Sequence, residues 1–201
     1  DGRQPMTDSS GRLGIVYNGE LYNFVELREE LRRAGHAFAT GTDTEVILEA
    51  YKEWGEACLD RFNGMFAFAL HDATKRLLFC ARDRYGEKPF LYVHKEGFFA
   101  FASEYKALLS LPGVAAEFDE FRLIRGLHSA SMGWDAESQT VFREIRQLMP
   151  GECLTLTLGT GALRVRRYWE ALPDPALAGL SEADAATRFR ELLVDSIRIR
   201  M

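Results

Sequence analysis

Residues 17–23 constrain the fold more than any other segment, because Asn18-Gly19 follows a short apolar run and precedes an acid, Glu20. The apolar run predicts a strand over residues 13–17. Asn-Gly is the strongest two-residue hairpin signal, so the dipeptide taken alone favours a turn after that strand. An asparagine amide and a glycine N–H at a strand end can also form a two-donor pocket for a developing oxyanion. The local sequence leaves both interpretations open.

Composition excludes several classes of function. The 201 residues, 47% of them apolar, suit one large domain, or one domain and the start of another. A net charge of −5 argues against a nucleic-acid partner, and no apolar run approaches the length of a membrane span. Cys58, Cys80 and Cys153 are scattered without metal-ligand spacing, and the histidines form no ligand pattern. We therefore expect buried thiols, no metal site and a cytoplasmic protein.

The pattern of elements predicts helices near the front of the chain and antiparallel hairpins behind them. Two capping boxes, Asn23 with Glu26 and Thr42 with Glu45, predict helix starts. Hairpins are predicted from residues 65–71 with 77–82, 90–94 with 98–102, and 152–158 with 163–169, short helices over 105–111 and 119–127, a loop over 129–134, and a last helix from residue 181. This order indicates an α+β domain with helices packed on sheets.

Asp43 supplies a second carboxylate after Glu20. If Thr42 caps the helix, Asp43 lies in its first turn, where free N–H groups and the helix dipole favour an anion. Asp43 is then a structural residue. In the alternative interpretation, Glu20 and Asp43 together hold an ammonium group, such as the α-amino group of an amino acid.

The opening motif and five others follow one another along the chain, and together they make the pattern specific. These six motifs are residues 17–23, 42–45, 64–69, 81–89, 101–108 and 148–152. Together they resemble the glutaminase domain of glutamine-hydrolysing asparagine synthetases over nearly the whole chain. The resemblance implies an N-terminal-nucleophile hydrolase fold, a four-layer α/β/β/α sandwich of antiparallel sheets. In that family an N-terminal cysteine attacks the side-chain amide of glutamine with its own α-amino group as base, and the thioester is then hydrolysed.

The resemblance implies a role for each of four residues. The amide of Asn18 and the N–H of Gly19 would form the oxyanion hole. The carboxylates of Glu20 and Asp43 would bind the α-amino group of glutamine. Residues 82–86 are interpreted as structural, a strand end and turn packed behind the site.

The resemblance also divides the chain. Residues 1–171 are expected to be a glutaminase domain without its N-terminal strand and nucleophile, 172–180 a linker, and 181–201 the first helix of a synthetase domain. None of the three cysteines can replace the nucleophile, because the mechanism needs a cysteine at position one, so this truncated chain is expected to be inactive. No cofactor is expected in it, and ATP and Mg²⁺ are expected for the synthetase domain. The expected partners are glutamine and that C-terminal domain. A homodimer is a further possibility that the sequence leaves undecided.

Two functions fit these observations. In the first, the chain is part of an asparagine synthetase that hydrolyses glutamine and uses the ammonia for ATP-dependent amidation of aspartate. In the second, it is a non-catalytic scaffold domain, as in β-lactam synthetases, which keep this fold, lack the cysteine and serve other ligases. The presence of all four predicted site residues favours the first, because an abandoned site has no reason to keep them.

Overall fold

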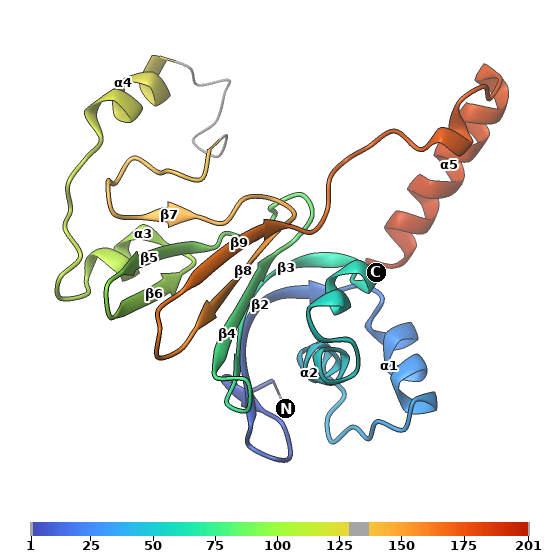
Figure 1. Ribbon diagram of the computed structural model, residues 1–201. Coiled ribbons are helices and arrows are strands. Elements are labelled where there is room, and N and C mark those ends of the chain that lie inside the picture. The colour runs from blue at the N-terminus through green and yellow to red at the C-terminus, as the bar shows by residue number, and fades with distance from the viewer. Residues whose placement is uncertain (1, 129–136, 201) are drawn as a thin grey trace.

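A computed structural model, which describes residues 2–128 and 137–200, contains two antiparallel sheets (Figure 1). The larger sheet has the spatial order β1 (Met6–Thr7), β2 (Leu13–Leu21), β3 (Gly64–Asp72), β4 (Leu77–Arg82), β8 (Glu152–Thr157) and β9 (Leu163–Arg167). The smaller sheet has the order β6 (Phe98–Ala102), β5 (Leu91–Lys95) and β7 (Arg146–Gln147). The predicted α+β class and all three predicted hairpins are confirmed. The predicted loop over residues 129–134 lies outside the described residues.

Helices cover the outer sides of the two sheets. On the side of the larger sheet that faces away from β5 and β6 lie α1 (Phe24–Arg33), α2 (Asp43–Trp54) and the 3-10 helix η1 (Gly55–Arg61). Next to the smaller sheet is α3 (Tyr105–Leu109), which contacts β5 and β6, and further along the chain comes α4 (Glu120–His128), which has no buried residue. The layers run from helices through two sheets to helices, as the four-layer expectation requires.

The core is built by the two-residue period of the strands. On β2, Ile15 and Tyr17 face α1 and α2, while Val16 faces the smaller sheet. On β3, Phe66 and Phe68 join the helix side, and the small Ala67 lies between the sheets with Phe90 and Tyr92 of the other sheet. All three cysteines are buried and unpaired, as expected.

The turn that the Asn18-Gly19 dipeptide alone favours does not form, because β2 continues through the dipeptide to Leu21. Gly19 pairs with Phe66 of β3 in an unbroken ladder. A Cβ on Gly19 would lie 2.2 Å from the carbonyl oxygen of Met65, closer than any side chain can approach. Glycine is therefore required here by a close approach of two strands and not by a turn.

The two capping boxes also differ from expectation. The Thr42 hydroxyl accepts a hydrogen bond from the Glu45 N–H, so the cap of α2 is confirmed, but the Glu45 carboxylate accepts from the preceding loop. Asn23 precedes α1 without a side-chain cap. Its amide group instead donates to the Arg61 carbonyl and accepts from the Asn63 N–H, bonds between distant segments that a local pattern could not predict.

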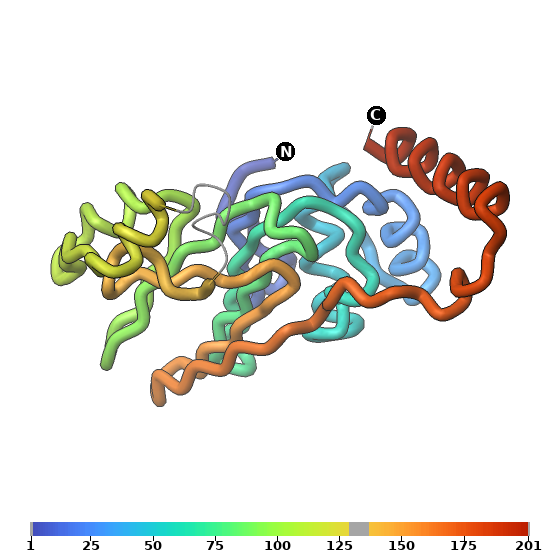
Figure 2. The backbone as a smooth tube through the Cα atoms, turned by 90° about the horizontal axis from the view of Figure 1, so that it is seen from above, coloured from blue at the N-terminus to red at the C-terminus, as the bar shows by residue number. Residues whose placement is uncertain are grey.

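The last helix, α5 (Glu182–Arg198), stands apart from the sheets at the end of a segment that includes the short 3-10 helix η2 (Pro175–Leu177), as Figure 2 shows from above. Four exposed apolar residues follow helical spacing on it: Phe189, Leu192, Leu193 and Ile197. Beyond the helix, the Arg200 guanidinium lies 4.4 Å from the ring centroid of Tyr22. No described helix combines the length and the apolar character that crossing a bilayer requires.

Candidate active site

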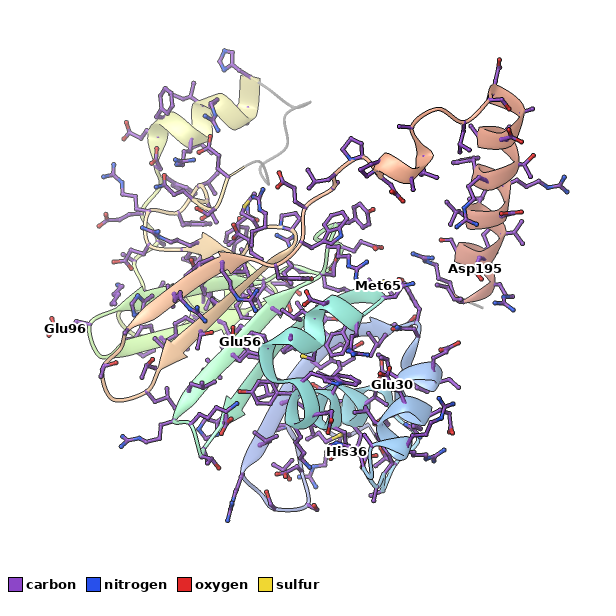
Figure 3. All side chains as sticks on the ribbon, turned by 45° about the vertical axis from the view of Figure 1, so that its right-hand side comes forward. Glu30, His36, Glu56, Met65, Glu96 and Asp195 are labelled. Atoms are coloured by element: carbon purple, nitrogen blue, oxygen red, sulfur yellow. The ribbon has the colours of Figure 1, made fainter. Side chains whose placement is uncertain are left out.

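Asn18 and Glu20 lie on the face of β2 that is turned toward the smaller sheet, and both are exposed. The Asn18 amide nitrogen donates to the Ser103 hydroxyl, 3.4 Å away, directly after β6. A cavity of about 230 Å³ beside them is lined by Gln4, Phe101 and both hydrogen-bonded residues. In Figure 3, Met65, the partner of Glu20 in the ladder, lies on the opposite side of the molecule from Glu96 at the β5–β6 tip. The site is therefore at one end of the sheets.

The ladder determines where the Gly19 N–H points. Phe66, opposite Gly19, uses both of its main-chain groups toward Asp83: its N–H donates to the carboxylate at 3.2 Å, and its carbonyl accepts from the Asp83 N–H at 2.7 Å. In an antiparallel pair, opposed residues either bond each other or both point away. Gly19 therefore points its N–H away from β3, to the outer edge of β2.

The residues two positions before and after Gly19 point to the same edge, and side chains take up their N–H groups. The Tyr17 N–H donates to Oε1 of Gln4 at 2.6 Å, and the Tyr17 carbonyl accepts from Nε2 of Gln4 at 2.8 Å. The Leu21 N–H donates to Oδ2 of Asp43 at 3.0 Å. Between them, the N–H of Gly19 has no acceptor within the described parts of the chain.

Asp43 is the first residue of α2, and this position brings its carboxylate to the edge of β2. Oδ2 accepts from the Tyr17 hydroxyl at 2.9 Å as well as from the Leu21 N–H, while Oδ1 takes no hydrogen bond from any described residue. Burial and the nearby Asp43 charge raise the pKa of Tyr17 far above its usual value, so the phenol stays a donor. Glu20 makes no hydrogen bond or ion pair within the described ranges. The structure thus brings Asp43 to the strand that carries the other three predicted residues, without a direct Glu20–Asp43 contact.

The segment over residues 82–86 is structural, as the sequence suggested. Asp83 is fully buried. Its carboxylate accepts four main-chain hydrogen bonds, from Phe66, Tyr85, Glu87 and Lys88. The buried Arg82 guanidinium donates to three carbonyls, those of Gly86, Lys88 and Leu148. This network fixes the chain at the end of β4 and ties it to the neighbouring end of β3.

Neither a metal nor a reactive thiol is indicated at this site. Across residues 2–128 and 137–200, no group of three or more histidine, cysteine or acidic side chains is arranged to hold a metal ion. Burial raises the pKa of Cys153 to about 11 and also raises the pKa values of Cys58 and Cys80 well above that of a free thiol. These thiols stay protonated near neutral pH and pack in the core.

Sequence reasoning missed Gln4, Tyr17 and Ser103 as residues of this site. Ser103 lies within the motif over residues 101–108, which offered a signal. Tyr17 lies in the opening motif, but nothing local marks its hydroxyl as a partner of Asp43. Gln4 gave no signal beyond its position ahead of β1.

Comparisons with known proteins agree with this architecture. The model of the "Glutamine amidotransferase domain" family matches residues 1–169. "Asparagine synthetase [glutamine-hydrolyzing] 3" of Bacillus subtilis is 40% identical over 200 residues, covering 98% of this chain and 31% of the relative. "Asparagine synthetase [glutamine-hydrolyzing] 1" of the same organism is 31% identical, covering 100% of this chain and 31% of the relative. The chain thus spans about a third of the length of these curated relatives.

Solved structures agree on the fold. Glutamine phosphoribosylpyrophosphate amidotransferase from B. subtilis matches with a TM-score of 0.55 and 20% identity, covering 84% of this chain and 32% of that one. A structure described as the allosteric regulatory enzyme of purine biosynthesis matches with a TM-score of 0.57, the same identity and the same coverage. The expected N-terminal-nucleophile hydrolase fold is confirmed. With 169 residues matched by one family model, the chain belongs to the glutamine amidotransferase domain family.

Proposed function

We propose that this chain is the glutaminase domain of a glutamine-hydrolysing asparagine synthetase, with Asn18 and Gly19 as its oxyanion hole. The open Gly19 N–H beside the Asn18 amide carries this proposal. Attack on the side-chain amide of glutamine places negative charge on its oxygen, and donors from two successive residues can stabilise that charge. Each such donor contributes roughly 100- to 1000-fold to turnover in enzymes of this type.

Glu20 and Asp43 support glutamine as the substrate. Glu20 is exposed and has no partner within the described ranges, and Asp43 keeps Oδ1 unused at the edge of β2 toward which the Gly19 N–H points. Two carboxylates with spare acceptor capacity suit an α-amino group, which carries three donors and a positive charge. In this proposal they hold the amino acid end of glutamine while its amide reaches Asn18 and Gly19.

The free edge of the smaller sheet suggests where the nucleophilic N-terminal cysteine would lie. β6 is an edge strand, and nothing described pairs with its outer side. Two cavities, of about 230 and 660 Å³, share Phe101 on its inner face. The family's N-terminal strand, added antiparallel to β6, would begin beside Ser103 and run past both cavities. Its first residue, the cysteine, would then lie next to Asn18.

In this mechanism, the cysteine sulfur forms a bond to the amide carbon and its proton passes to the free α-amino group. Asn18 and Gly19 stabilise the oxyanion until the C–N bond breaks and ammonia leaves with a proton. Water then attacks the thioester through a second oxyanion in the same hole, releasing glutamate. The chain's own residues thus contribute orientation and charge stabilisation, and bond making belongs to the N-terminal cysteine.

A synthetase domain following this chain completes the proposed protein. The curated relatives are about three times as long as this chain, and α5 leaves the sheets with its apolar residues exposed. We place α5 with the next domain, which would use ATP and Mg²⁺ to activate aspartate for amidation by ammonia. An apolar helix face of this kind needs a partner surface to be buried.

Glutamate release from glutamine tests the proposal. The full-length protein, produced from its complete gene with its native start, should release glutamate. The chain of residues 1–201 alone should release none, since its own thiols are buried and protonated. A full-length protein that binds glutamine without releasing glutamate would favour the scaffold alternative, and release by the isolated chain would show a nucleophile that this account does not contain.

A further inference from the structure

The Gly19 N–H is left open by an arrangement of side chains on either side of it. We propose that Gln4, Tyr17 and Asp43 are positioning residues that hold both flanks of Gly19 and so present its N–H to the reacting amide. This inference rests on the proposed function for its kinetic consequence, and on the hydrogen bonds that Gln4, Tyr17 and Asp43 make on either side of Gly19 for its structural content.

The main-chain ladder between β1 and β2 stops before it reaches Gly19, and Gln4 lies just beyond its end. Met6 pairs with Ile15, so the same register would place the main chain of Gln4 opposite Tyr17 and that of Gly2 opposite Gly19. The Gln4 side chain takes the place of a strand neighbour instead, because its amide bonds both main-chain groups of Tyr17. A ladder continued by main chain would have consumed the Gly19 N–H.

Asp43 holds the other flank and links it to the first. Its Oδ2 accepts from both the Tyr17 hydroxyl and the Leu21 N–H, so one oxygen joins the residues on the two sides of Gly19. The other oxygen stays available for a substrate ammonium. A single carboxylate can therefore fix the strand and bind glutamine, which unites the two interpretations that the sequence left open for Asp43.

Gly19 needs such support because glycine has the freest backbone of all residues. The ladder with β3 holds this part of β2 along one edge only, Gly19 has no side chain to pack at the other edge, and the neighbouring Asn18 and Glu20 are exposed. An oxyanion donor must be preorganised to be effective, and a misplacement of about 1 Å can cost roughly 100-fold in rate. Two fixed flanks supply that order.

The kinetic test uses Gln4→Met and Tyr17→Phe in the full-length protein, since both keep the side-chain volume and remove the hydrogen bonds. We expect kcat for glutamine hydrolysis to fall about 10- to 100-fold in each, with KM within about twofold, because the loss falls on the transition state. Gln139→Met, at an exposed position, and Tyr51→Phe are matched controls. Tyr51 also donates its hydroxyl to a carboxylate, Asp72, in the same core, so Tyr51→Phe measures what a lost Tyr–Asp bond costs the fold alone. Controls should keep kcat within about twofold.

A structural readout decides the inference without reference to activity. Hydrogen–deuterium exchange of the full-length protein, resolved to single residues by electron-transfer fragmentation, should show the Gly19 amide exchanging at least about tenfold faster than those of Tyr17 and Leu21. In Gln4→Met, the Tyr17 amide should lose its protection.

Two results would overturn the inference: protection of Gly19 equal to that of its neighbours, or variants whose kcat falls no further than that of the matched controls. If the wild-type protein releases no glutamate while the exchange pattern holds, the proposed function fails and the hydrogen-bonded arrangement around Gly19 stands.

Discussion

Two aspartates beside the larger sheet, Asp43 at the start of α2 and Asp83 after β4, each accept main-chain hydrogen bonds, yet they differ in how many acceptor positions they leave unused. Asp83 is fully buried and both of its oxygens are saturated by four N–H groups. Asp43 is half-buried, and only one oxygen is engaged. A saturated carboxylate can only hold structure, whereas a half-used carboxylate beside an open N–H can also bind a substrate. The number of unused acceptor positions on the carboxylate, more than the residue type, distinguishes the surroundings of Asp43 from those of Asp83.

The largest effect on stability should come from Asp83→Ala. Four buried N–H groups would lose their acceptor at once, so we expect the free energy of unfolding to fall by about 3 to 5 kcal/mol. Urea denaturation measures this change. Asp60→Ala, at an exposed position in η1, should change it by less than about 0.5 kcal/mol. An equal, small loss of unfolding free energy in both variants would contradict the structural role assigned to Asp83.

Asp43→Asn should show the opposite balance. The amide keeps an oxygen for the Leu21 N–H, so the free energy of unfolding should fall by only about 1 kcal/mol. Loss of the negative charge removes the ammonium partner, and we expect KM for glutamine to rise about 10- to 100-fold. Steady-state kinetics of the full-length protein measures this. A stability loss as large as that of Asp83→Ala, with unchanged KM, would make Asp43 a structural residue only.

The smallest effect lies far from the site, at His36 (Figure 3), whose ring nitrogens face Glu49 at 2.7 Å and Glu53 at 2.8 Å. Burial lowers the pKa of His36, but the hydrogen bonds with the two carboxylates outweigh it, so the net pKa is raised. A raised pKa stabilises the fold below the unfolded-state value of about 6.5 and loses that contribution as pH rises through the folded-state value.

His36→Gln should therefore cost about 1 kcal/mol of unfolding free energy near pH 6 and less above neutrality, with kcat for glutamine unchanged. Urea denaturation of both proteins across this pH range gives the difference. A stability difference that grows with pH would contradict the assignment of a protonated His36 between two carboxylates.

The sequence predicted what depends on local pattern. The hairpins follow from alternating apolar residues and polar turns, and the Thr42 cap from its spacing to Glu45. The turn that Asn18-Gly19 alone favours does not form. The turn signal is local, whereas the pairing with β3 and the close approach to Met65 involve residues far away in the sequence. Asn23 failed as a cap for the same reason, since its amide bridges segments forty residues apart.

The candidate site could be predicted from the sequence only in part. The resemblance to asparagine synthetases pointed to Asn18, Gly19, Glu20 and Asp43, and the structure places three of them on one strand and the fourth against it. Gln4 could not be found, because its role depends on where β1 stops pairing with β2. Nor could spacing reveal that Asp43 uses a single oxygen, since that depends on how α2 packs against the edge of β2.

Replacement of Asn18 by alanine in the full-length protein tests the central claim most directly, with asparagine synthesis measured from glutamine and from free ammonia. We expect synthesis from glutamine to fall roughly 100- to 1000-fold, while synthesis from ammonia stays within about twofold, because only the first requires an oxyanion hole. An equal fall in both activities would show that Asn18 supports the structure of the protein and does not stabilise the oxyanion.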